Sequence, residues 1–201
     1  IYAVGNYGTI LKWPVNGNPN LLGHGEAAGT NFWTIWKADD GTLWVGGHEI
    51  ESPRIFRYKD GVMEEQSISI DYPTTGDHGY IHSISGQGQT LWAVGSKGGF
   101  LVPPEDRACL ALYYENGLWQ EAHPPCDSDE LNDVAFSSEG EVWIADLAGS
   151  LLVYDPDSES WRKVISEPAH PWGRLWWLNG QLYLFAFDGT FARMNPDETF
   201  V

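Results

Sequence analysis

The sequence lacks long hydrophobic runs and has few basic residues. No apolar run approaches the roughly 20 residues that a membrane-spanning helix needs, so we expect no membrane insertion. Lys and Arg number 11 against 28 Asp and Glu, which gives a formal net charge of −17 at pH 7. A negative field of this size repels phosphate backbones, and the composition therefore predicts no nucleic-acid partner.

Sequence signatures of catalysis are also missing. There is no His-Glu-x-x-His, Gly-x-Ser-x-Gly or Cys-x-x-Cys pattern and no EF-hand loop. We therefore predict no catalytic residue, no metal ligand and no cofactor. One alternative is Ca²⁺ at the acidic stretch Asp127-Ser128-Asp129-Glu130, because carboxylate and hydroxyl oxygens are the ligands that Ca²⁺ prefers.

Short apolar runs separated by turn residues are abundant. Residues 132–155 hold three runs of strand length, each ended by a cluster of Ser, Gly, Asp or Pro, and a fourth run follows at 160–165. Eleven Trp, nine Tyr and eight Phe suit pleated surfaces. The chain shows no helical periodicity over a useful length. The stretch is typical of a four-stranded antiparallel meander.

A pair of apolar and aromatic residues recurs along the chain roughly every 40 to 50 residues, a period that indicates a repeat architecture. The pairs are Ile1-Tyr2, Leu43-Trp44, Leu91-Trp92, Val142-Trp143 and Leu182-Tyr183. In several copies Gly follows within a few residues, and Tyr and Trp recur further on, as Tyr154 and Trp161 do after Trp143. The copies indicate one structural unit used about five times.

This pattern resembles the tryptophan-rich β-propeller repeats of bacterial proteins, in particular the two-component-regulator type and its relatives. The resemblance implies an all-β propeller of four-stranded antiparallel blades, with about five blades. Ile1 falls where the second strand of a blade is expected, so the first blade is expected to be incomplete. We expect residues 1–201 to form a single propeller domain that is a fragment of a longer protein.

The two cysteines can be placed by hairpin arithmetic. Asn116-Gly117 is the strongest two-residue turn signal in the chain, and such a turn pairs Glu115 with Leu118. Continuing that register places Cys109 opposite position 124, close to Cys126. A disulfide between Cys109 and Cys126 is therefore expected, with two free buried cysteines as the alternative. A disulfide indicates an extracytoplasmic location: periplasmic, secreted or cell-surface.

Candidate ligand-binding residues follow from aligning the expected innermost strands. Four different side chains then occupy one repeated position, two residues before Ile35, Ile84, Val134 and Trp176; they are Trp33, His82, Asn132 and Arg174. The resemblance places this position at one mouth of the channel. Two loop residues, His48 and Trp172, are expected at the same mouth.

These residues predict a non-catalytic module that binds a small molecule, a glycan or a protein at the channel mouth. His82 and Arg174 favour a ligand with a negative or hydrogen-bond-accepting group. One alternative is a glycoside-active or other hydrolytic propeller enzyme, which needs two carboxylates in the channel and has Asp133 and Glu26 to offer. The other is a lectin-like propeller, which would repeat similar groups in every blade.

Overall fold

A computed structural model describes residues 1–23, 27–50, 52–71, 78–98, 102–165, 170–195 and 198–201. The described part is built from β-strands and turns, with one short 3₁₀ helix, η2 (Pro104–Asp106). Among these residues no helix is long and apolar enough to cross a bilayer. The predicted all-β fold class is confirmed.

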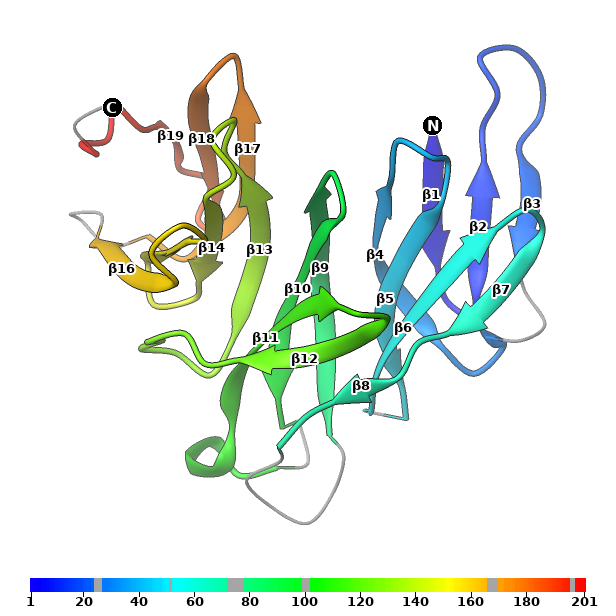
Figure 1. The fold of residues 1–201 in the computed structure, drawn as a ribbon, viewed down its shortest axis with the longest axis horizontal. Helices are drawn as coiled ribbons and strands as arrows, with labels where there is room; N and C mark the ends of the chain where they lie inside the picture. The colour runs from blue at the N-terminus through cyan, green and yellow to red at the C-terminus, as the bar shows by residue number, and fades with distance from the viewer. Residues whose placement is uncertain (24–26, 51, 72–77, 99–101, 166–169, 196–197) are drawn as a thin grey trace.

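The strands form five sheets, numbered I to V here in chain order (Figure 1). Sheet I contains β1 (Tyr2–Gly5), β2 (Thr9–Lys12) and β3 (Asn20–Gly23). Sheet II contains β4 (Asn31–Lys37), β5 (Leu43–Glu49), β6 (Ser52–Lys59) and β7 (Val62–Glu65). Sheet III contains β8 (Ile68–Ser69), β9 (Gly79–Gln87), β10 (Thr90–Lys97), β11 (Ala108–Glu115) and β12 (Leu118–Ala122). Sheet IV contains β13 (Leu131–Phe136), β14 (Val142–Asp146), β15 (Ser150–Asp155) and β16 (Ser160–Ile165). Sheet V contains β17 (Trp172–Leu178), β18 (Gln181–Ala186) and β19 (Phe191–Arg193).

The sheets stand next to one another in an open arc, with sheet I and sheet V at its two ends (Figure 1). The innermost strands of sheets II to V, which are β4, β9, β13 and β17, are in contact in series, β4 with β9, β9 with β13 and β13 with β17. With the exception of β8, consecutive strands within each sheet are antiparallel neighbours. The predicted four-stranded meander of 132–165 is confirmed in sheet IV.

Sheet III departs from the predicted repeat because it has a fifth strand. Strand β7 ends sheet II at Glu65, and β8, which follows it in the chain, pairs in parallel with β12 of the next sheet. A partly buried ion pair of sheet III, with Lys97 Nζ 2.5 Å from Glu121 Oε1, anchors this crossing, because Lys97 also donates to the Asp71 carbonyl oxygen at 3.1 Å. The Asp71 backbone N–H donates to the second Glu121 oxygen at 2.9 Å. The crossing segment thus ties sheet II to sheet III.

Aromatic rings fill the spaces between consecutive sheets. Trp44 of sheet II contacts Tyr114 and Trp119 of sheet III, with ring centroids 4.9 and 5.8 Å apart. The same arrangement recurs between sheets III and IV. There Trp92 contacts Tyr154 and Trp161, with ring centroids 5.3 and 5.7 Å apart. Trp143 of sheet IV contacts Trp177 of sheet V at 5.7 Å. Three of the five recurring pairs found in the sequence, those that contain Trp44, Trp92 and Trp143, therefore mark a junction between two sheets.

Each innermost strand from β4 to β17 has a β-bulge near the same end, at which its pairing with the next strand shifts by one residue. The extra residues are Trp33, His82, Asn132 and Gly173. Two of the bulges need a glycine opposite them, because a Cβ at Gly47 or Gly95 would lie within 2 Å of a carbonyl oxygen of the bulged strand, 1.9 and 1.8 Å respectively.

The bulges correct the predicted alignment at one position. Trp33, His82 and Asn132 are equivalent, as the sequence predicted, but their counterpart in sheet V is Gly173. Arg174 lies one residue later, at the position of Asp133 in sheet IV. The predicted register was wrong because Leu175, and not Trp176, is the counterpart of Val134. Residues 175–178 are all apolar, so the sequence does not show that Leu175 is buried while Trp176 is exposed.

The predicted hairpin register is confirmed, with Glu115 opposite Leu118 and Ala111 opposite Ala122. Cys109 and Cys126 are joined in a disulfide, and their Cα atoms are 6.7 Å apart. The bridge links the start of β11 to the segment after β12.

Candidate functional site

Four aromatic side chains gather at the bulged ends of β4 and β9. Trp33 projects from the bulge of β4, and its ring stacks on Tyr80 at 5.2 Å and on His82 at 5.3 Å. His48, at the end of β5, meets Trp33 edge-on at 5.0 Å and Tyr80 at 4.8 Å. Trp33 remains 44% exposed. The structure therefore brings together three predicted residues, and Trp33 offers an indole to solvent.

Tyr80 is the member of this cluster that was not predicted from the sequence. It lies two residues before His82 on β9, so both side chains lie on one face of the strand. Side chains alternate between the two faces of a strand, so the position of Tyr80 two residues before His82 was the signal available in the sequence.

His82 is largely buried, and burial is the main cause that lowers its pKa to about 4. The charges of Arg174 and His48 act in the same direction. The ring is therefore neutral at pH 7. Its Nδ1 lies 3.1 Å from the Leu131 carbonyl oxygen, and a neutral ring with its proton on Nδ1 donates to that oxygen. This contact joins sheet III to sheet IV and fixes the ring beneath Trp33.

Asn132 and Arg174 continue the row into sheet V. The Asn132 side-chain amide donates to the Trp172 carbonyl oxygen at 2.9 Å. The Arg174 guanidinium reaches the carbonyl oxygens of Asn132 and Gly173, both at 3.4 Å. Within the described residues Arg174 forms no ion pair with a carboxylate. It is an exposed cation at the same end as the aromatic cluster.

Trp172 does not present its ring to a ligand in this structure. It is 1% exposed and lies in the hydrophobic cluster between sheets IV and V. Its neighbours include Phe200, with centroids 6.0 Å apart, and His170 at 5.4 Å. The expectation that Trp172 contacts a ligand is corrected here. Its indole packs between the two sheets and has no face exposed to a ligand.

The position after each bulge carries a second row of polar groups, and these connect neighbouring sheets. The Ile84 backbone N–H donates to the Thr34 hydroxyl at 3.1 Å. The Ser83 hydroxyl donates to one Asp133 oxygen at 2.5 Å, and the Leu175 backbone N–H donates to the other at 2.8 Å. Sheets II to V are therefore linked through side chains near their inner edges.

Asp133 is buried, and burial raises its pKa while its hydrogen bonds oppose that shift. Both of its oxygens accept hydrogen bonds from the protein. A carboxylate held in this way connects sheets and is not free to attack or protonate a substrate. Glu26, the second carboxylate of the hydrolytic alternative, lies outside the described residues.

The acidic stretch proposed for Ca²⁺ has other contacts. Asp127 pairs with Lys163, and the Ser128 hydroxyl donates to the Glu130 carbonyl oxygen at 2.8 Å. Burial and the charge of Asp129 raise the pKa of Glu130. Within the part of the chain that the structure describes, no group of three or more His, Cys, Asp or Glu side chains is placed to hold a metal ion.

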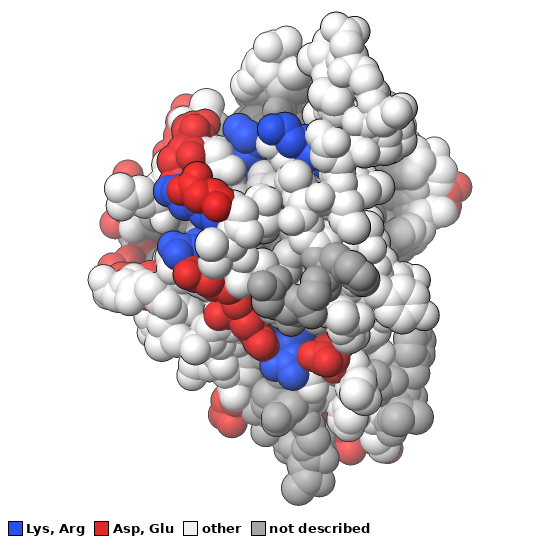
Figure 2. Space-filling model, turned by 90° about the vertical axis from the view of Figure 1, so that its right-hand side faces the viewer, with Lys and Arg blue, Asp and Glu red and all other residues white. Residues whose placement is uncertain are grey.

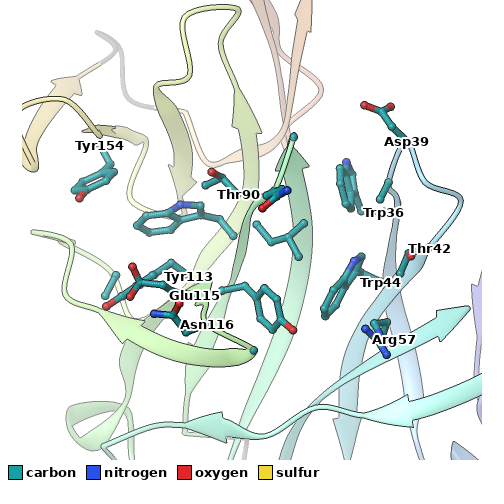
Figure 3. A pocket seen from close by; sticks show the side chains of 18 of the residues that line it. Trp36, Asp39, Thr42, Trp44, Arg57, Thr90, Tyr113, Glu115, Asn116 and Tyr154 are labelled. Atoms are coloured by element: carbon teal, nitrogen blue, oxygen red, sulfur yellow. The ribbon is translucent and has the colours of Figure 1, made fainter.

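A large open groove, which the sequence did not predict, lies at the other end of the innermost strands. Its volume is about 1250 Å³. It extends around the β9–β10 turn and the β11–β12 hairpin, between sheets II and IV (Figure 3). The aromatic members of its lining are Trp36, Trp44, Trp92, Tyr113, Tyr114, Tyr154 and Trp161.

Comparisons with known proteins support the fold. No family model and no curated protein matches the sequence. Virginiamycin B lyase from Staphylococcus aureus superposes with a TM-score of 0.72 at 14% identity, over 97% of this chain and 62% of that chain. YCF48 bound to D1 peptide superposes with a TM-score of 0.61 at 14% identity, over 100% of this chain and 63% of that chain. The extracellular domain of the putative one-component system BT4673 from B. thetaiotaomicron superposes with a TM-score of 0.61 at 14% identity, over 100% of this chain and 30% of that chain.

The chain thus spans about three fifths of the length of the first two of these solved structures. At such low identity the likeness shows the fold alone, and that fold is of the propeller type.

Proposed function

We propose that the chain is a non-catalytic binding module whose ligand site is the row from Trp33 through His82 to Arg174. The observation that carries the proposal is an exposed indole, supported from behind by Tyr80 and His82, at the same end as an arginine without a carboxylate partner among the described residues. Flat rings stack on indole, and arginine binds carboxylates through two parallel hydrogen bonds.

The ligand that fits is a small molecule or peptide end with a planar apolar group and a carboxylate. The planar group lies on Trp33 and the carboxylate meets Arg174. The rest of the acidic surface repels such a ligand, which confines binding to this end. One of the solved structures supports a binding role by analogy, since it contains YCF48 bound to D1 peptide.

The location proposed for this module is extracytoplasmic. The disulfide between Cys109 and Cys126 supports it, because disulfides persist in oxidising compartments. The hydrolytic alternative is not favoured, since both oxygens of Asp133 are engaged in bonds between sheets.

Ligand-observed NMR with a set of aromatic carboxylates and their methyl esters tests the site. We expect the acids to bind and the esters to bind at least tenfold more weakly, because only the acids pair with Arg174. Trp33→Ala and Arg174→Ala should each abolish detectable binding. Lys37→Ala, at the other end of β4, is the matched control and should leave it intact. If binding survives in both site variants, the wrong end of the sheets has been chosen.

We further infer that the five sheets are consecutive blades of one propeller domain and that up to three more sheets complete its ring, since propellers have typically four to eight blades. Strand β14 is buried along its whole length, whereas β18 alternates between buried and accessible residues. Tyr183 occupies the position of Trp143 but faces no further sheet among the described residues. At the other end of the arc Trp13, next in the chain to β2, is 48% exposed.

The surface at the sheet I end supports this inference. The side of the molecule that carries sheets I and II has wide areas without charged side chains (Figure 2). Appending a second copy of residues 131–165 after Val201 tests the idea, because that copy provides a Tyr and a Trp to receive Tyr183. Amide exchange in β18 should slow at least tenfold, and it should not slow when both of those aromatic residues are changed to Ser in the copy. Unchanged exchange with the intact copy would contradict ring completion.

A further inference from the structure

The groove at the end opposite Trp33 is larger than a small-molecule pocket. Its volume of about 1250 Å³ exceeds the 300 to 1,000 Å³ that is common for such pockets. It is open to solvent and is bordered by three turns: β4–β5, β9–β10 and β11–β12. A long open groove of this size suits an extended peptide segment.

The two sides of the groove are lined with aromatic rings. Trp36 and Trp44 of sheet II project from one side, and Tyr113 and Tyr154 lie on the other (Figure 3). Trp36, Tyr113 and Tyr154 are half-buried, so parts of their rings face the groove. The faces of Trp and Tyr attract Lys and Arg side chains through cation–π interactions.

The charges that line the groove are unbalanced. Both of its long cationic side chains are already neutralised: Lys59 Nζ lies 2.6 Å from Asp40, and the Arg57 guanidinium lies 2.6 Å from Glu64. Three exposed carboxylates remain on the rim, and among the described residues none of them is paired with a cation; they are Asp39, Glu115 and Glu159. The groove therefore carries an excess of negative charge within a protein whose net charge is −17.

We propose that this groove binds a basic peptide segment in extended conformation. Its Lys or Arg side chains lie against the aromatic walls, and their charged ends pair with Glu115, Glu159 and Asp39. The charge excess excludes nucleic acid and anionic lipid as occupants, because both are polyanions. The site is separate from the Trp33 row, since the two lie at opposite ends of the innermost strands.

Tryptophan fluorescence with a defined probe tests the proposal in the full 201-residue chain. The probe is an eight-residue peptide that alternates Arg and Gly, compared with the same peptide carrying Glu in place of Arg. We expect saturable binding of the Arg peptide at low salt, weakening as salt rises, and no binding of the Glu peptide.

Matched variants separate a built site from general attraction to an acidic protein. Glu115→Gln with Glu159→Gln removes two charges at the groove and should weaken binding about tenfold, the loss expected for two exposed ion pairs. Glu105→Gln with Asp129→Asn removes two charges at the other end and should change it less than twofold.

A third variant tests the aromatic wall. Trp36→Leu should weaken the affinity several-fold without changing its salt dependence, because a ring contributes no net charge. Equal weakening by the two charge pairs, or no saturable binding of the Arg peptide at low salt, would overturn the proposal. Loss of Arg-peptide binding in Trp33→Ala would also overturn it, by assigning the peptide to the other end.

Discussion

Replacing Asp133 with Ala should be among the most destabilising changes of a polar side chain in this protein. Asp133 is 7% exposed and links three sheets. One oxygen accepts from the Ser83 hydroxyl at 2.5 Å and from the Val134 N–H at 3.0 Å, and the other accepts from the Leu175 N–H at 2.8 Å. The alanine variant removes all three acceptor contacts at once.

The magnitude follows from what is left behind. Hydrogen bonds to a charged group contribute about 1.5 to 3 kcal/mol, and a buried donor left without a partner costs about 1 to 3 kcal/mol. Two donors from other sheets, the Ser83 hydroxyl and the Leu175 N–H, lose their acceptor. A loss of about 4 kcal/mol in the free energy of unfolding is expected for Asp133→Ala, allowing for partial relaxation. Asp133→Asn keeps an acceptor and a polar group in place and should cost about 1 to 2 kcal/mol.

Urea unfolding followed by circular dichroism measures both variants, with the exposed Asp157→Ala as the control that should stay within about 0.5 kcal/mol of the parent. A double-mutant cycle with Ser83→Ala isolates the contact between Ser83 and Asp133. The two changes should be non-additive by about 1 kcal/mol or more. Additive losses, or a loss below about 1 kcal/mol for Asp133→Ala, would refute the claim that this carboxyl group connects the sheets.

The pH dependence gives a second readout. Burial raises the pKa of Asp133 in the folded state above its ordinary value of 3.8. The folded state therefore binds the proton more tightly than the unfolded state between 3.8 and the raised pKa, and stability falls as pH rises through that window. The difference in unfolding free energy between the parent and Asp133→Asn should shrink over the same window.

Three further expectations concern other parts of the molecule. Changing Cys109 and Cys126 to Ser should lower the free energy of unfolding by about 3 kcal/mol in non-reducing urea titrations, because the bridge closes a loop with a sequence separation of 17 residues, and reductant should then have no further effect. His82, whose pKa falls from 6.5 to about 4 on folding, binds fewer protons in the folded state, so stability should fall by roughly 3 kcal/mol as pH drops from 6.5 to 4; a His82→Phe variant with the same pH profile would contradict this. Trp119→Ala should lower the free energy of unfolding by about 3 to 5 kcal/mol because the Trp119 side chain is fully buried, whereas Trp33→Ala should lower it by under about 1 kcal/mol. Equal losses of stability in thermal unfolding would disprove the burial argument.

Local features of the fold could be predicted from the sequence. Asn116-Gly117 set the register of its hairpin, because few two-residue turns match the twist of paired strands, and this register led to the disulfide. The recurring aromatic residues predicted both the repeat and its approximate length. The turn residues and the recurring aromatic residues both belong to a single repeat, so each can be recognised without knowing how the repeats pack against one another.

The candidate site could be predicted in part. Trp33, His48 and His82 do come together, because equivalent strands bring equivalent positions to one end of the arc. The shift at Arg174 was not visible in the sequence, since residues 175–178 are all apolar and their pattern does not show which side chains face the core.

Other features depend on contacts between units and were decided only by the tertiary structure. Trp172 looks like any other loop aromatic in the sequence, and its burial depends on how sheet IV packs against sheet V. The crossing of β8 to sheet III requires a free strand edge that only the folded sheet provides. The groove is lined by residues from three sheets, and the neutralisation of Arg57 and Lys59 that leaves it negative is a matter of side-chain geometry. The sequence alone determined the unit and its number of copies along the chain; how those units face one another, and hence where a ligand can bind, was determined by packing between them.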